Sequence, residues 1–134
     1  MLQEHNDIEI VCITVKKENV QEHIRHDSNE LYNYMIKLAI IDKILDQDSV
    51  TLIPDPRTIK VADGNSLFNY LQINLWFEHN VSTRIKWESC SSENSLNLQF
   101  IDMISHVVWR HYEKNLSRNF RVLIPLIENK ELFF

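Results

Sequence analysis

The sequence predicts an α/β fold in which short, mainly parallel strands alternate with amphipathic helices. Three apolar runs have the length and residue types of strands, and the segments between them repeat apolar residues every three or four positions. The order strand, helix, strand, helix, strand, helix favours about three parallel strands joined by right-handed crossovers, with helices packed on the sheet. A chain of 134 residues that is 44% apolar and 25% charged is expected to form one domain, residues 1–134.

The first strand and the first helix have clear local signals. Residues 8–15 are apolar on both alternating faces, which is typical of a strand covered on both sides. Asp27, followed three residues later by Glu30, resembles a capping box. Apolar residues then recur at helical spacing as far as Leu45, so we expect a helix of about five turns.

Two later strands each lead into an acidic residue. Residues 50–53 form a short apolar run that two nearby prolines terminate, which places Asp55 at the carboxyl end of a strand. Residues 67–79 have helical periodicity, and residues 81–87 alternate as a half-exposed edge strand that Glu88 follows. Open parallel sheets bind ligands beyond the carboxyl ends of their strands, so both acids lie where a ligand is expected.

The last long helix is predicted from Ser95 to about Asn115, before a final apolar segment that Pro125 interrupts. Its apolar stripe is expected to contain Leu98, Ile101, Ser105, Val108 and Tyr112. Asp102 lies within this stripe, beside Gln99 and before His106. A carboxylate that loses water needs a hydrogen-bond donor, a cation or an open cleft. Asp102 is therefore either a structural acid satisfied by a neighbouring loop or a functional acid.

Composition excludes several classes of protein. With one glycine, the chain has no glycine-rich phosphate loop of the Rossmann or Walker type. No apolar run approaches the roughly 18 residues that cross a bilayer, so we expect a cytoplasmic protein without a membrane partner. Cys12 and Cys90 match no metal-ligand spacing and imply no disulfide framework.

The charge distribution leaves nucleic-acid binding open. A net charge of −5 argues against broad, non-specific binding. Arg110, Lys114 and Arg118 are spaced by four, so they share one face if the helix extends that far, and such a face is suited to phosphate contacts. A stripe of this kind is also typical of solvated helix surface.

The acidic positions resemble those of a known family of bacterial and phage proteins. Ile53-Pro54-Asp55, Glu88-Ser89 and the Leu98-Gln99-Phe100-Ile101-Asp102 element are similar to the carboxyl-terminal two-thirds of the domain of unknown function 3800 family. The resemblance implies a ribonuclease-H-like fold and metal-dependent nuclease chemistry. It also implies that Asp55, Glu88 and Asp102 are the catalytic acids, with Gln99 and Ser89 as supporting motif residues.

One family element has no counterpart in this sequence. Family members begin with a strand that carries Asp-Glu-Ser-Gly, and nothing in residues 1–7 matches it. We therefore expect a ribonuclease-H-like domain that is truncated at its amino end. Either the strand at residues 8–15 fills the gap in the sheet, or another chain supplies the missing strand.

Two functions follow from these expectations. The first is an incomplete or degenerate metal-dependent nuclease that acts on nucleic acid, with Mg²⁺ or Mn²⁺ held by Asp55, Asp102 and His106. The second is a non-catalytic module that binds a protein partner or itself. A homodimer is suggested by aromatic residues that exceed what one small core covers: Trp76, Phe77, Trp87, Trp109, Phe133 and Phe134.

Overall fold

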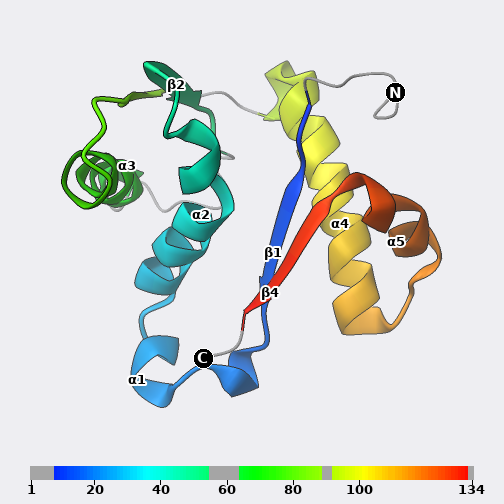
Figure 1. Ribbon diagram of the computed structural model, residues 1–134. Coiled ribbons are helices and arrows are strands. Elements are labelled where there is room, and N and C mark those ends of the chain that lie inside the picture. The colour runs from blue at the N-terminus through cyan, green and yellow to red at the C-terminus, as the bar shows by residue number, and fades with distance from the viewer. Residues whose placement is uncertain (1–7, 55–63, 89–91, 133–134) are drawn as a thin grey trace.

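The computed structural model describes residues 8–54, 64–88 and 92–132 as a mixed α/β protein (Figure 1). The elements follow in the order β1 (Val11–Val15), α1 (Glu22–Arg25), α2 (Ser28–Ile44), β2 (Ser49–Leu52), α3 (Gly64–Ile73), β3 (Arg84–Trp87), α4 (Leu96–Lys114), α5 (Arg118–Leu123) and β4 (Glu128–Leu132). A π-helical turn, Asn74–Glu78, continues α3. Short 3₁₀ turns occupy Lys17–Asn19, Ser92–Asn94 and Ile124–Leu126.

The described strands form two small parallel sheets, whereas the sequence predicts a single sheet of about three strands. β1 pairs with β4, and β2 pairs with β3. The strand expected at residues 8–15 therefore pairs with a fourth strand that the sequence analysis missed. That strand has the polar sequence Glu-Asn-Lys-Glu-Leu, which carries no apolar signal. Parallel pairing is confirmed for every described strand.

The first hydrophobic core lies between α2, α3 and the β2–β3 sheet. Its buried residues are Ile41, Ile44, Leu67, Leu71, Leu75 and Ile85. The helix that supplies the first two begins as predicted, because the Asp27 carboxylate accepts a hydrogen bond from the Glu30 N–H at 3.2 Å. The sequence therefore predicts the start of α2, whereas packing against α3 and β3 selects Ile41 and Ile44 from its apolar residues for burial.

A buried amide fixes α3 to the beginning of β3. Gln72 is only 6% exposed, and its Nε2 donates to the Thr83 carbonyl at 2.8 Å. Its Oε1 accepts from the Ile85 N–H at 2.9 Å. The Thr83 hydroxyl in turn donates to the Gln47 carbonyl at 2.7 Å, which joins the turn before β2 to the same network. One side chain thus satisfies two backbone groups that burial removes from water.

The second core lies between β1, α4 and α5. Its buried residues are Ile10, Ile104, Val108, Phe120 and Leu123. The buried stripe of α4 therefore differs from the predicted one, of which only Val108 is buried. Ile101 is 48% exposed, and Ser105 is exposed. The helix has apolar residues on two sides, and contact with α5 and β1 decides which side is buried.

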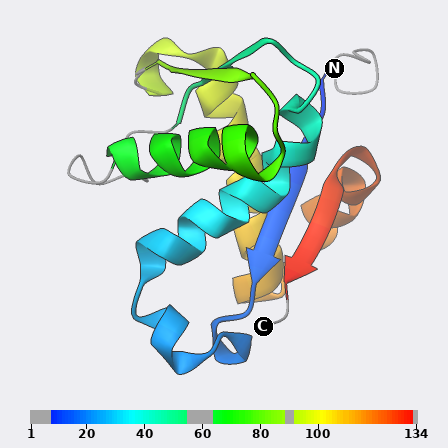
Figure 2. The same cartoon turned by 60° about the vertical axis from the view of Figure 1, so that its left-hand side comes forward.

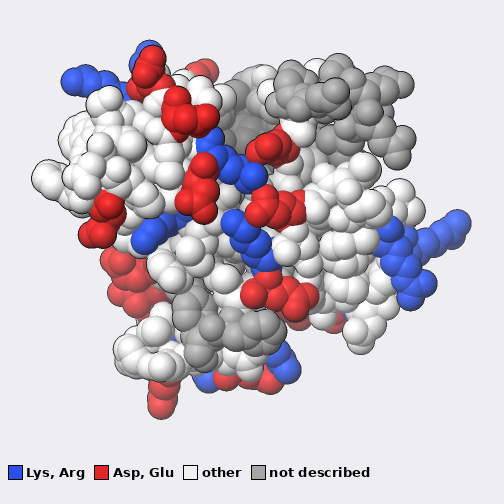
Figure 3. Space-filling model, viewed as in Figure 1, with Lys and Arg blue, Asp and Glu red and all other residues white. Residues whose placement is uncertain are grey.

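Helix α2 also contacts the β1–β4 sheet and so connects the two cores. The views in Figures 1 and 2 place α2 and α4 on opposite sides of this sheet. Lys43 of α2 forms ion pairs with Glu9 at 3.1 Å and with Glu128 at 2.9 Å. Lys130 pairs with Glu128 at 3.3 Å and donates to the Leu38 carbonyl at 3.1 Å. Acidic and basic groups accordingly alternate along the middle of the face in Figure 3.

Among the described residues, no helix has the length and apolar character needed to cross a membrane.

Gln72→Leu should lower the free energy of unfolding by about 2–4 kcal/mol, because it leaves the Thr83 carbonyl and the Ile85 N–H buried without their partner. Asn69→Leu is the matched control, since it makes the same kind of change on the exposed side of the same helix. Urea unfolding of both variants measures the difference. Equal losses would show that the amide does not hold α3 on β3.

The ion pairs of Glu128 should make stability depend on acid pH. Lys43 and then Lys130 lower the pKa of the Glu128 carboxyl below its ordinary value. A lowered carboxyl pKa adds stability that is complete above about pH 4.3 and is lost as the pH falls below it. The melting temperature should therefore fall less steeply below this pH in Glu128→Gln than in the native chain. Glu22→Gln, an exposed acid on α1, should retain the native acid profile.

Candidate functional site

The carboxyl ends of β2 and β3 lie together, as the sequence predicts for a ligand-binding edge. The two strands are parallel, with Leu52 aligned with Trp87. Glu88 follows directly, and its N–H donates to the Leu52 carbonyl at 3.0 Å, while its side chain is exposed. Glu88 is thus positioned at this sheet edge. Asp55 and Ser89 lie outside the described residues.

Helix α4 begins at the predicted position. Ser95 is its N-cap, and the Ser95 hydroxyl accepts a hydrogen bond from the Leu98 N–H at 3.2 Å. Gln99 lies in the first turn and donates through Nε2 to the Glu93 carbonyl at 3.5 Å. The cap fixes the first residue of α4. Side chains three or four residues apart then share a face, so the cap also determines which residues lie on the same face as Gln99.

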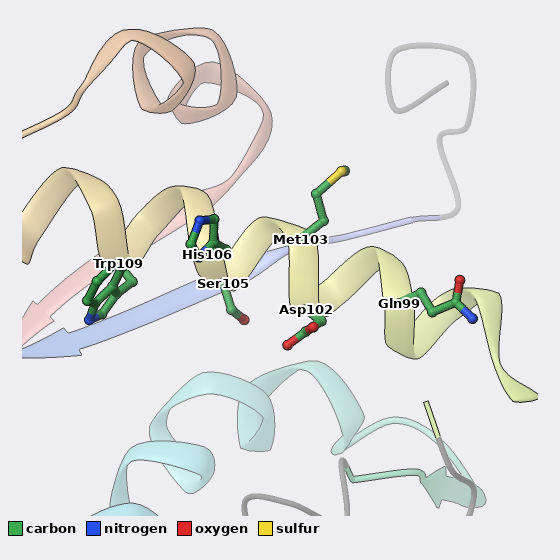
Figure 4. Close-up of a pocket in the computed structure, with 6 residues that line it drawn as sticks. All are labelled: Gln99, Asp102, Met103, Ser105, His106 and Trp109. Carbon is green, nitrogen blue, oxygen red and sulfur yellow. The ribbon is translucent and has the colours of Figure 1, made fainter. Parts of the chain in front are cut away.

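A shallow pocket that is widely open to solvent runs along this side of α4. It is lined by Gln99, Asp102, Met103, Ser105, His106 and Trp109 (Figure 4). Asp102 and Ser105 project from one side of the helix, and Met103 projects from the opposite side. The structure therefore brings three predicted residues, Gln99, Asp102 and His106, to one surface. Their spacing of three and four residues is the signal that predicts this grouping.

Asp102 is exposed, so the expectation that it loses water on folding is wrong. The buried stripe of α4 passes through Ile104 and Val108 instead. An exposed carboxylate retains its hydration, and its presence on the helix needs no compensating buried partner. The burial argument for a special role of Asp102 therefore no longer applies. Its place in an open pocket is the feature that remains.

Aromatic and basic residues continue the pocket toward the end of α4. The rings of His106 and Trp109 stack with their centroids 5.8 Å apart and an interplanar angle of 22°. The Lys114 ammonium lies over the Trp109 ring at 5.4 Å from its centroid, a cation–π contact. Trp109 itself is 48% exposed. Trp109, which the sequence marks only as a surplus aromatic residue, is a lining residue of this pocket.

The predicted basic stripe does not continue along one helix. α4 ends at Lys114, where Asn115 takes a left-handed conformation with φ of 55°. The Leu116 N–H returns to the Arg110 carbonyl at 3.1 Å and closes the helix end. Arg118 therefore belongs to α5 and does not continue the face of Arg110 and Lys114.

The described residues alone do not provide a complete metal site. Within residues 8–54, 64–88 and 92–132, no three His, Cys, Asp or Glu side chains group closely enough to hold a metal ion. The Asp102 carboxylate and the Gln99 amide carbonyl are oxygen ligands of the kind that Mg²⁺ prefers. A full set of ligands would need a further acid, and Asp55 is the candidate that the sequence offers.

Comparisons with protein-family models, with curated proteins and with solved structures found no match to this chain.

Proposed function

We propose that this chain is an incomplete or degenerate relative of ribonuclease-H-like, metal-dependent nucleases. It binds nucleic acid and cleaves its phosphodiesters slowly or not at all. One observation carries the proposal: the parallel strands β2 and β3 end together. The sequence places an acid shortly after each strand, Asp55 and Glu88. A third acid, Asp102, lines an open pocket on α4. This arrangement supports a phosphate- and cation-binding surface made of acids that are distant in the sequence.

In this proposal Asp55, Asp102 and Glu88 are the acids that act on the phosphodiester, and Asp55, Asp102 and His106 hold Mg²⁺ or Mn²⁺. A divalent ion in such a site supplies positive charge against the phosphate. Gln99 lies one turn before Asp102, and Ser89 follows Glu88 directly. The basic side chains Arg110 and Lys114, which share a face of α4, are the proposed phosphate contacts, whereas Arg118 lies on α5 and is not part of this face.

The proposed ligand set is small for hydrolysis. Cleavage with two metal ions about 4 Å apart commonly uses three or four carboxylates that hold both ions. The sequence contains no Asp-Glu-Ser-Gly element to supply a fourth acid. Asp102 is also exposed, and an exposed acid holds a cation more weakly than one in a closed site. The site is therefore expected to bind a cation weakly and to hydrolyse slowly.

A specific observation favours a second candidate, a non-catalytic module that binds a protein partner or itself. Three large apolar side chains close together on α3 and the π-helical turn that continues it are exposed: Ile73 (54%), Trp76 (44%) and Phe77 (72%). Clusters of such residues on a monomer mark surfaces that other proteins cover. A homodimer, or a partner chain that adds a strand to one of the two-stranded sheets, would cover apolar surface or open sheet edges.

If the acids hold a cation, Mg²⁺ or Mn²⁺ should raise the melting temperature by about 4–6 °C at ten times its dissociation constant. Asp102→Asn should abolish that rise. Glu113→Gln, which neutralises another exposed acid of α4, should keep it. Differential scanning calorimetry with and without metal measures the shift. The same response in all three proteins would leave Asp102 without a role in cation binding.

The chain should cleave single-stranded or double-stranded nucleic acid very slowly, because the proposed metal ligands, Asp55, Asp102 and His106, include only two carboxylates. Any Mg²⁺-dependent cleavage should disappear in both Asp55→Asn and Asp102→Asn. Gel analysis of labelled substrates with matched preparations of each variant gives the rates. Cleavage that persists in both variants would contradict the proposed acids, and rapid cleavage by the native chain would contradict an incomplete site.

A further inference from the structure

Helix α3 and its π-helical continuation carry apolar residues on two opposite sides. One side is buried in the first core and contains Leu67, Leu71 and Leu75. The other side remains in solvent and exposes Ile73 (54%), Trp76 (44%) and Phe77 (72%). We name these last three residues the α3 outer patch. A helix that is apolar on both sides is normally covered on both sides.

The π-helical turn contributes to this arrangement. Asn74 and Leu75 are both buried at the start of the turn, and the next two residues, Trp76 and Phe77, are both exposed. The His79 N–H closes the turn on the Asn74 carbonyl at 3.1 Å. Single π-helical turns are uncommon and are found frequently at functional sites. The turn therefore presents two adjacent aromatic side chains to solvent in an ordered segment.

The α3 outer patch is located at the margin of the molecule. Figure 1 shows α3 end-on at the outer side of α2, and Figure 2 shows it in front of α2. The surface over α3 at the left of Figure 3 is mostly uncharged. Residues 64–77 contain no Asp, Glu, Lys or Arg. Residues 64–77 therefore carry no charge, and the three apolar patch residues lie at the end of this stretch, after the polar, exposed Asn69.

The exposed area is appropriate for the centre of a protein interface. From typical side-chain areas, the three residues expose about 350–400 Å². Two such patches in contact would bury on the order of 700–800 Å², roughly half of the 1,200–2,000 Å² that a stable interface buries. The polar residues around the patch would supply the remainder as a rim.

We propose that the α3 outer patch is the contact surface for a second copy of this chain. The protein carries a net charge of −5, so two copies repel each other across most pairs of faces. They repel least along residues 64–77, which carry no charge; Glu78, the next residue, lies at the edge of the patch. An apolar stripe on one helix is also self-complementary under two-fold symmetry. Such a dimer would follow the self-associating alternative given above and does not depend on Asp102.

Sedimentation velocity of the full chain from 1 to 100 µM tests this dimer. The native chain should be dimeric at the upper concentrations. Phe77→Arg should weaken association about tenfold or more, because it places two like charges in the apolar contact. Val122→Arg is the matched control: Val122 is 73% exposed on α5, close to the 72% of Phe77, and it lies outside the patch. It should leave the dimer intact.

Circular dichroism shows whether Phe77→Arg is folded; if it is not, Ile73→Gln provides the same test with a smaller change. A native chain that is monomeric at 100 µM would overturn the proposal. A dimer that persists in both patch variants would show that the interface lies elsewhere on the chain. Equal disruption by Val122→Arg would show that the association is not specific to the patch. The metal response of Asp102 is a separate measurement, so a failure here is distinguishable from a failure of the nuclease proposal.

Discussion

The relative position of the two cores depends on the contact between α2 and the β1–β4 sheet. α2 contributes buried residues to the first core, whereas the second core contains none of its residues. Lys43, Glu128 and Lys130 connect the two sides through ion pairs and through the bond to the Leu38 carbonyl. Single exposed ion pairs contribute little to stability. Here, however, the Glu128 carboxylate of β4 pairs with two ammonium groups, that of Lys43 on α2 and that of Lys130 on its own strand. This network orients α2 on a sheet whose β1 residues are only half buried.

The proposed acids lie on the surface of elements that belong to different cores. Glu88 follows β3 beside the first core, and Asp102 lies on α4, which packs in the second. A shift of the β1–β4 sheet along α2 would therefore change the separation of the acids without altering either core. If the proposed function is right, it is linked to the contact around Lys43 for this reason. Because Asp102 is exposed, the proposed cation binding there would depend on additional ligands approaching it rather than on a low dielectric around it.

Local signals predicted the helix boundaries well, and tertiary contacts decided the rest. Asp27 caps α2 and Ser95 caps α4, since a cap is determined by residues within one turn. β4 was missed because a polar strand is recognised only through its partner, β1. The grouping of Gln99, Asp102 and His106 followed from helical spacing, but the buried side of α4 did not. Two apolar stripes on one helix are equivalent until α5 packs against one of them.

The same ambiguity has a different outcome on α3. There the first core covers the longer apolar side, and within the described chain the shorter one, with Ile73, Trp76 and Phe77, stays exposed. The two proposed surfaces do not compete for space, because α3 and α4 lie on opposite sides of α2 in both ribbon views. A dimer formed through α3 would leave the pocket around Asp102 and Trp109 open to solvent on each copy. Two such pockets with a fixed spacing would bind an extended polyanion more tightly than one pocket, because the second contact becomes intramolecular.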